Sequence, residues 1–417
     1  MPPVILLATT VEWPFAARLA GGFAQMRVRV EAMAPNGHVL ARSRYISAFH
    51  RYRPLAPEAA LERAIRSARP DLLIPCDDRA LAQALHVWRR AEARLDEEIS
   101  SLIARSLGNP AVYSRLGARA DFIADARAEG ILAPEMHVVD SEDALEAAIA
   151  GLGLPAVLKA DGSWGGDGVV IVRTRAEARD AWLRLSRTPS RARSLYRAID
   201  RRDLHRVAEA MRPPRTRLGI QAYVEGVPAT STFAARKGKV LAALHFDVVV
   251  APDSHGPASV VRRIEDPRMD LAVARIAQRY ELSGLHGLDF MRDARGNPHL
   301  IEINPRATPT SHLALGERGD LPAALSASFF SSRLKPRPTS VGTETSTSEI
   351  ALFPQEWLRD PKSAHLSSAY HDVPWDDPAL LHALIGRQAV QTLAGDRSQD
   401  AGNPGLAFPK PQFLQRE

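Results

Sequence analysis

The first hundred or so residues alternate between short apolar runs and alanine-rich stretches with helical spacing. The run Val4–Ala8 predicts a buried strand, and a helical stretch begins at Phe15. The apolar run in residues 71–78 (DLLIPCDD) predicts another buried strand, with a helical pattern over residues 79–95 after it. Strands that alternate with helices are typical of a parallel sheet. We therefore expect a small doubly wound α/β domain over residues 1–110.

The segment that follows the first apolar run, ATTVEWPF (residues 8–15), contains no glycine. Dinucleotide-binding domains carry GxGxxG at this place, because glycines let the backbone approach a pyrophosphate closely. The sequence therefore does not predict a dinucleotide site here.

A glycine-rich loop separates two apolar strands in LPAVLKADGSWGGDGVVIVRT (residues 154–174). Lys159 lies inside the first strand, and residues 169–172 form the second. A Walker loop instead enters a helix and carries its lysine at the end of the loop. The order strand, loop, strand predicts a β-hairpin lid.

Further strands are expected between residues 219 and 250, with turns at 225–226 and 237–238, followed by a helix from about residue 267 to 282. Residues 284–306 (GLHGLDFMRDARGNPHLIEINPR) predict a hairpin that turns at 295–297. Residues 335–348, rich in Pro, Ser and Thr, predict a linker before an appended segment, 349–417.

The last strand of that hairpin carries a carboxylate and a carboxamide at alternate positions. Glu302 and Asn304 are two residues apart, so in an extended strand both side chains point the same way. A strand end with a polar rim would show the same pattern. The preceding strand, however, places Asp289 where it can face both residues across the ladder. Three oxygen donors of this kind suit Mg²⁺, and Lys159 with the glycine loop supplies groups that bind phosphates. Together they predict a nucleoside triphosphate site.

Composition narrows the class of protein. The chain has 417 residues, 45% of them hydrophobic and 24% charged, which is ordinary for a globular protein of two or three domains. The one cysteine, Cys76, rules out a disulfide framework within the chain. We expect no membrane span and a cytoplasmic location.

The net charge of +6 comes mostly from arginines, which are concentrated in residues 183–218. That segment fits either a solvated helical insertion or a basic wall for an anionic substrate, and its few aromatic residues argue against a nucleic-acid partner.

The residues from about 107 to 325 resemble the ATP-grasp superfamily of carboxylate–amine ligases, which includes the large subunit of carbamoyl phosphate synthetase, biotin carboxylase and D-alanine–D-alanine ligase. The match is strongest in DFMRDARGNPHLIEINPR (residues 289–306), and the lysine strand, glycine hairpin, hinge strand and metal hairpin occur in the family's order. The resemblance implies an α/β (α+β) fold in which the first domain precedes an ATP-grasp domain over residues 111–334, with a lid subdomain at about 131–220.

The resemblance also implies roles for particular residues. Mg²⁺, with Mn²⁺ as an alternative, would be held by Asp289, Glu302 and Asn304. Arg306 would hold the transferred phosphate and act with Lys159 in catalysis. The implied ATP-binding residues are Arg119, Lys159, Gly165, Gly166, Gly168, Gln221, Val224 and Glu225. Arg119 would otherwise be a solvated helix arginine, and Trp164 in the glycine loop would cap the lid or stack on a substrate.

The loops that the resemblance places around the acceptor contain groups able to grip a carboxylate or position an amine: Arg262, Arg263, His255, Ser311 and His312. The implied activity is ATP-dependent ligation of a small-molecule carboxylate to an amine or thiol through an acyl phosphate. Many members of the superfamily dimerise, so a homodimer is a candidate assembly. Two alternatives remain at this stage: a phosphotransferase that uses the same grasp, and a nucleotide-binding module without catalysis.

Overall fold

The computed structural model describes residues 2–162, 168–186, 217–252, 257–316, 319–331 and 348–386. The centre of the glycine loop, most of the arginine-rich segment and nearly all of the expected linker lie outside these residues.

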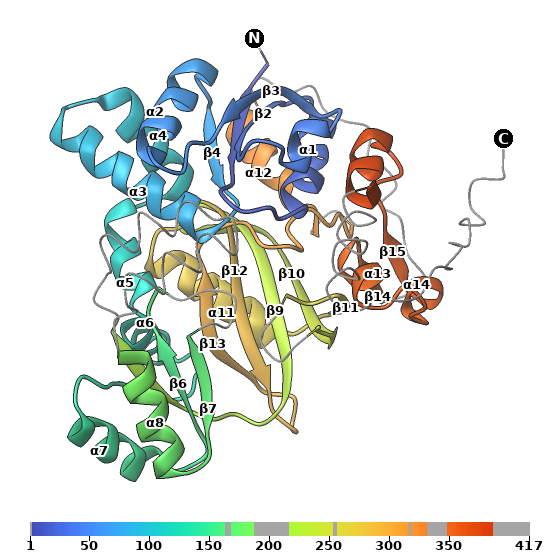
Figure 1. Cartoon of the computed structure of the whole chain (residues 1–417). Coiled ribbons are helices and arrows are strands. Elements are labelled where there is room, and N and C mark those ends of the chain that lie inside the picture. Colours follow the sequence, from blue (N-terminus) through green and yellow to red (C-terminus); the bar gives the residue numbers. More distant parts are fainter. Residues whose placement is uncertain are drawn as a thin grey trace, which may run out of the picture.

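The first domain is a four-stranded parallel sheet in the order β3-β2-β1-β4, as the sequence predicts (Figure 1). Its strands are β1 (Val4–Ala8), β2 (Arg29–Ala34), β3 (Ile46–Arg51) and β4 (Leu72–Pro75). Its helices are α1 (Phe15–Gln25), α2 (Pro57–Ala68), α3 (Asp78–Ala93) and α4 (Glu97–Leu107), with a short 3-10 turn at Val39–Arg42. Alternate residues of β1 enter different cores: Leu6 packs with residues of α2 and α3, while Ile5 and Leu7 pack with α1. Both faces of the sheet are therefore covered.

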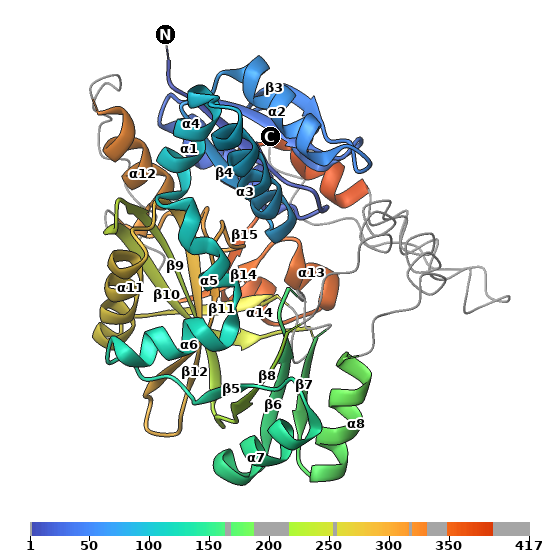
Figure 2. The same cartoon turned by 90° about the vertical axis from the view of Figure 1, so that its left-hand side faces the viewer.

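A second, antiparallel sheet has the order β5-β8-β6-β7 and comes from the part of the chain in which a lid is expected (Figure 2). Its strands are β5 (Met136–Val138), β6 (Ala156–Ala160), β7 (Val169–Val172) and β8 (Leu218–Ala222). Helices α7 (Glu142–Leu152) and α8 (Arg175–Ser186) share its apolar core with Leu158 and Ile220. In the hairpin, Lys159 of β6 pairs with Val169 of β7.

The central sheet has seven strands in the order β13-β12-β9-β10-β11-β14-β15. Five of them belong to the predicted ATP-grasp region: β9 (Val227–Arg236), β10 (Lys239–Val250), β11 (Val260–Ile264), β12 (Gly284–Arg292) and β13 (Pro298–Asn304). Helix α11 (Pro267–Arg279) covers one face, where Met269 and Ile276 share a core with Phe233 and Phe290 (Figure 2). Helix α12 (Leu321–Phe330) contacts β9, β10 and α1. A 3-10 turn (Pro110–Val112) and helices α5 (Tyr113–Gly117) and α6 (Arg119–Ala128) connect the first domain to the lid sheet.

The chain beyond residue 348 is built into this sheet. Strand β14 (Glu349–Leu352) pairs antiparallel with β11, and β15 (Tyr370–Asp372) pairs parallel with β14. Short helices α13 (Gln355–Arg359) and α14 (His365–Ser368) lie between them. The same segment reaches the first domain, because Asp372 forms an ion pair with Arg18 of α1. The expected appended segment thus extends the central sheet, as far as the structure describes it.

None of the helices in the described part of the chain has the length and apolar character to cross a lipid bilayer.

Candidate active site

The two strands that carry the predicted metal ligands pair directly. Strands β12 and β13 run antiparallel, with Asp289 opposite Glu302 and Gly287 opposite Asn304. Asn304 Nδ2 donates a hydrogen bond of 2.7 Å to Asp289 Oδ2. The three residues therefore lie together at one end of the hairpin, on the edge of the central sheet.

The two carboxylates of this group repel each other. Burial and, after it, the charge of Glu302 raise the pKa of Asp289 to about 6. Hydrogen bonds from Thr230 Oγ1, at 2.9 Å, and from Asn304 offset only part of this effect. A bound divalent cation would relieve the repulsion.

The donor types of this group match a hard cation. It offers two carboxylates and a carboxamide, all oxygen donors, which suit Mg²⁺. In the described part of the chain, no cluster of three or more His, Cys, Asp or Glu side chains is arranged to hold a metal ion, and this group contains two acids and a carboxamide. Asp289, Glu302 and Asn304 could hold such an ion through their oxygen atoms.

Lys159 lies next to these acids although it belongs to the other sheet. The side chain is buried, and its Nζ is 3.5 Å from the backbone oxygen of Ile301 in β13. Burial lowers the pKa of Lys159 to about 8, with Arg119 adding to the shift and Glu302 and Asp289 opposing it. Because burying an ammonium group is costly, this position favours an anionic ligand.

Arg119 also reaches the metal hairpin. It is the first residue of α6, and its Nε is 3.4 Å from Glu302 Oε2. A second guanidinium nitrogen donates to the backbone oxygen of Ala160, which follows Lys159 in β6. Two cations and two carboxylates thus meet where the lid sheet faces the central sheet.

Arg306 lies just beyond β13 and joins the metal hairpin to the first domain. Its Nη2 donates to Asn304 Oδ1 at 3.0 Å and forms an ion pair of 3.0 Å with Asp78 Oδ2, at the start of α3. The guanidinium carbon lies 5.2 Å from the centre of the Trp13 ring, within cation–π distance. Its side chain is only 8% exposed, and its Nε has no hydrogen-bond partner among the described residues.

Sequence reasoning missed three of these neighbours: Thr230, Asp78 and Trp13. Thr230 is marked only by its position in β9, directly opposite Asp289. Asp78 and Trp13 follow strands β4 and β1 of the first domain, whose carboxyl ends meet at one edge of a parallel sheet, where ligands usually bind. That rule was the available signal, but the sequence did not show that this edge meets Arg306.

The hinge residues lie where strand β8 leaves the lid sheet. Gln221 is buried within β8, and its Nε2 has no hydrogen-bond partner in the described part of the chain. Val224 is half-buried and Glu225 is exposed in the loop between β8 and β9. Of the glycines, Gly168 precedes β7 and accepts a backbone hydrogen bond from Ala160 at 2.9 Å. Gly165, Gly166 and Trp164 lie outside the described residues.

Two of the candidate acceptor residues lie away from the metal hairpin. Arg262 and Arg263 are on β11, which β9 and β10 separate from β12 and β13. Arg262 forms a 2.7 Å ion pair with Glu349, and the side chain of Arg263 is 40% exposed. His255 lies outside the described residues.

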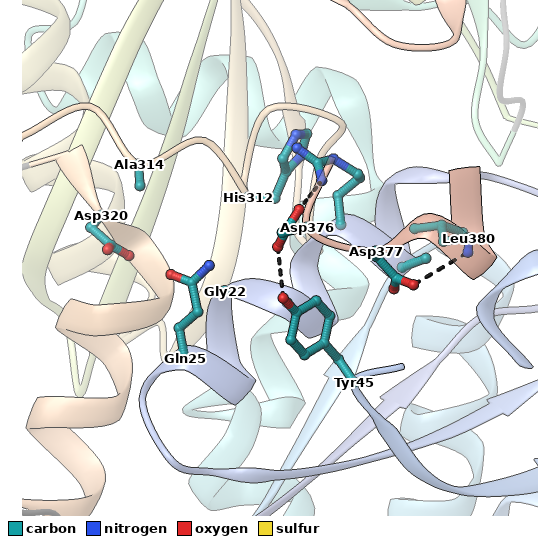
Figure 3. A pocket seen from close by; sticks show the side chains of 12 residues that line it. Gly22, Gln25, Tyr45, His312, Ala314, Asp320, Asp376, Asp377 and Leu380 are labelled. Atoms are coloured by element: carbon teal, nitrogen blue, oxygen red, sulfur yellow. Dashed lines mark hydrogen bonds and ion pairs between the residues drawn. The ribbon is translucent and has the colours of Figure 1, made fainter. Parts of the chain in front are cut away.

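Ser311 lies beside the strands of the metal hairpin, because its partner Thr232 pairs with Gly287 of β12, whereas His312 is engaged with the C-terminal segment. Ser311 is fully buried and hydrogen-bonds to the hydroxyl of Thr232 at 2.9 Å. His312 Nε2 lies 2.6 Å from Asp372 of β15. It lines a cavity of about 80 Å³ between α1, the loop before α12 and the C-terminal segment (Figure 3).

Solved structures of several enzymes have the same fold. N5-carboxyaminoimidazole ribonucleotide synthetase from Thermus thermophilus matches at 15% identity and a TM-score of 0.56, over 78% of this chain and 77% of that one. The corresponding synthase from Aspergillus clavatus, in complex with ADP and 5-aminoimidazole ribonucleotide, matches at 12% identity and a TM-score of 0.58, over 81% of this chain and 78% of that one. Biotin carboxylase from Campylobacter jejuni matches at 12% identity and a TM-score of 0.57, over 81% of this chain and 72% of that one.

No family model matches the sequence, and a comparison with curated proteins finds no match either. The structural likeness nevertheless settles the architecture. The chain has the ATP-grasp fold, preceded by an N-terminal α/β domain, as the resemblance of its sequence implies.

Proposed function

We propose that this protein is an ATP-dependent, ADP-forming ligase that joins a small-molecule carboxylate to an amine or another nucleophile. The proposal rests on the contact between the lid sheet and the central sheet. Asp289 and Glu302 on the metal hairpin lie beside Lys159 and Arg119, so that groups for a metal ion and for phosphates share one place.

Asp289, Glu302 and Asn304 would hold Mg²⁺, and Mn²⁺ has the same preference for oxygen ligands. When bound, the ion would neutralise charge on the nucleotide phosphates. Lys159 and Arg119 supply positive charge from the opposite sheet, and Gly165, Gly166 and Gly168 would cover the outer phosphates. The backbone near Gln221 and Val224 would pair with adenine, and Glu225 would bind the ribose.

The proposed reaction has two steps. An oxygen of the substrate carboxylate attacks the γ-phosphorus of ATP, and the bond from that phosphorus to the bridging oxygen breaks as ADP leaves. The nucleophile then attacks the carbonyl carbon of the acyl phosphate, phosphate departs with the electrons of the C–O bond, and the amine proton passes to solvent. Arg306 would hold the transferred phosphate through both steps. Such catalysis depends on positioning and charge neutralisation, so the enzyme needs no nucleophile of its own.

The neighbours suggest which substrates to try. One is described in complex with MgADP, ADP and bicarbonate, and another with ADP and 5-aminoimidazole ribonucleotide. Bicarbonate therefore belongs among the candidate carboxylates, and amino-substituted heterocycles belong among the candidate amines. Cytoplasmic location, a homodimer and the absence of a nucleic-acid partner remain predictions.

The test is ADP release from Mg·ATP across an array of carboxylates and amines, singly and in pairs, with mass spectrometry of the products. We expect ADP only where a carboxylate and an amine are both present, together with a product of the condensed mass. ADP accompanied by a phosphorylated acceptor would instead indicate a phosphotransferase. Nucleotide binding without turnover anywhere in the array would indicate a binding module.

A further inference from the structure

The buried carboxylate of Asp77 forms hydrogen bonds to the loop after β1. Asp77 Oδ2 accepts hydrogen bonds from Thr9 Oγ1 at 2.9 Å and from the backbone nitrogen of Thr10 at 2.5 Å. Asp77 Oδ1 accepts from Thr10 Oγ1 at 2.9 Å and from the backbone nitrogen of Ala80 at 2.8 Å. All three of Thr9, Thr10 and Asp77 are buried. The carboxylate of Asp77 thus accepts from the backbone nitrogens of Thr10 and of Ala80, in the first turn of α3.

The hydrogen bonds of Asp77 disfavour the binding of a phosphate group at this edge of the sheet. Parallel α/β domains bind phosphates through exposed N–H groups of a glycine-rich loop after the first strand and at a helix N-terminus. Here the corresponding loop has no glycine, and a carboxylate already occupies the N-terminus of α3. Asp78 places a second acidic side chain in the same turn. A phosphate ester at this edge would meet two carboxylates, and the backbone donors of Thr10 and Ala80 are already engaged.

The same edge forms one wall of the site around Arg306. The backbone nitrogen of Ala307 donates to the carbonyl of Pro75, at the end of β4, at 3.1 Å. Asp78 pairs with Arg306, and Trp13 lies against the guanidinium. The side chain of Asp78 is 28% exposed, so an incoming molecule can also reach it. A molecule that comes from the side of the first domain toward a phosphate bound to Arg306 therefore passes the acidic side chain of Asp78 and the aromatic side chain of Trp13.

We infer that the first domain selects an amine that carries no phosphate group, with Asp78 and Trp13 as the residues that determine this specificity. The inference rests on the proposed ligase function. An ammonium or amino group gains attraction from the Asp78 carboxylate and from the face of Trp13. A phosphorylated amine loses by repulsion from Asp77 and Asp78.

Matched pairs of amines that differ by one phosphate test the inference. Suitable pairs are ethanolamine and O-phosphoethanolamine, glucosamine and glucosamine 6-phosphate, and 5-aminoimidazole riboside and its ribonucleotide. Each member is assayed for ADP formation with Mg·ATP and the carboxylates of the array. In parallel, its binding to the protein saturated with Mg·ADP is measured by calorimetry. We expect the unphosphorylated member of a pair to be preferred by at least tenfold.

The variant Asp78→Asn keeps a side chain that can hydrogen-bond to Arg306 but removes the charge. Loss of one close charge should reduce the preference within a pair by about tenfold. The quantity to compare is the ratio of the activities with the two amines of a pair. A general loss of activity that acts through Arg306 lowers both activities equally and leaves this ratio unchanged. Glu265→Gln, at a side chain that is 90% exposed, is the matched control and should leave the ratio unchanged.

Three results would overturn the inference while leaving the ligase in place. They are a preference for the phosphorylated members, an unchanged ratio in Asp78→Asn, and condensation of a carboxylate with a nucleophile while no amine of any pair reacts or binds. Absence of ADP formation from every combination would contradict the proposed function itself, and the inference with it.

Discussion

Asp289 and Glu302 stand directly opposite each other on neighbouring strands of the central sheet. A sheet usually avoids like charges at facing positions, because they destabilise the pairing. Here one of the two acids is also hydrogen-bonded by Thr230 and Asn304, so its side chain is held in place despite the repulsion. Unfavourable charge that is fixed in position is characteristic of a site for a cation.

The raised pKa of Asp289 predicts proton release on metal binding. Because this pKa is about 6, the free carboxyl is partly protonated near that pH, whereas a metal ligand must be deprotonated. The affinity for Mg·ADP should therefore fall by up to tenfold for each pH unit below 6. Calorimetry at pH 6 in buffers of different ionisation enthalpy should show the released proton, and Asp289→Asn should abolish it. A pH-independent affinity between 5 and 7 would contradict the metal assignment.

The raised pKa of Asp289 also predicts how the stability of the ligand-free protein depends on pH. This pKa is higher in the folded than in the unfolded chain, so between about pH 4 and 6 the folded state binds more protons. Through this group, the free energy of unfolding should fall as the pH rises through this range, by on the order of 3 kcal/mol. Urea unfolding at several pH values measures this effect: between pH 4 and 6 the free energy of unfolding of Asp289→Asn should rise more, or fall less, than that of wild type. Equal slopes would show that Asp289 has an ordinary pKa.

Glu302→Gln should nearly abolish ATP turnover and leave the fold intact. The amide keeps the size of the side chain but removes a metal-binding charge, and we expect a loss of at least about 100-fold in kcat. In the absence of Mg²⁺ the variant should melt close to wild type, since it relieves the repulsion with Asp289 but loses the attraction to Arg119 and Lys159. Glu265→Gln serves as the control for turnover and melting. Unchanged turnover in Glu302→Gln would refute the assignment of the metal site.

Lys159→Met should change the stability of the protein and its affinity for ATP in opposite directions. The ammonium is buried and its pKa is lowered to about 8, so charge at this position opposes folding at neutral pH. Methionine should raise the melting temperature of the free protein while weakening ATP binding by about 100-fold, because the phosphates lose a close cation. The matched control is Lys237→Met, at an exposed residue in the turn between β9 and β10. A variant that binds ATP normally would show that Lys159 is only structural.

Asp372 should be important for stability, because it joins the C-terminal segment to the rest of the protein. It is buried between Arg18, at 2.6 Å, and His312, also at 2.6 Å. Burial alone would raise its pKa, but these two partners lower the pKa to about 2.

Asp372→Ala would leave both partners without this carboxylate and should destabilise the protein by about 3 kcal/mol. In wild type, the contribution of this group should be complete above pH 4 and be lost as the pH falls from 4 toward 2. Urea midpoints measure both effects, with Asp180→Ala, on the exposed face of α8, as the control. Equal midpoints for the two variants would show that the contact is dispensable.

The order of elements was predictable because local patterns determine it. Alternation of apolar and polar residues identified the hairpin around Asp289 and Glu302, and the buried run at Val4–Ala8 identified the first parallel strand. The lysine strand was equally clear, since a charge in an apolar strand is costly and therefore informative.

Contacts between distant parts of the chain could not be predicted in the same way. Nothing local to Asp78 indicates that it will pair with Arg306, because that pair depends on how the first domain sits on the central sheet. The pairing of β14 with β11 joins segments almost ninety residues apart, with the expected linker between them. His312 looked like a substrate residue because it lies in a polar loop, but its partner, Asp372, comes sixty residues later.

The most direct test of the proposed ligase follows one oxygen atom. The substrate carboxylate from the productive pair of the array is labelled with ¹⁸O, and the released phosphate is analysed by mass spectrometry or phosphorus NMR. If the carboxylate attacks the γ-phosphorus and the nucleophile then displaces phosphate, one labelled oxygen must appear in the phosphate. Phosphate without label, formed together with the condensed product, would contradict the acyl phosphate and the reaction proposed for this site.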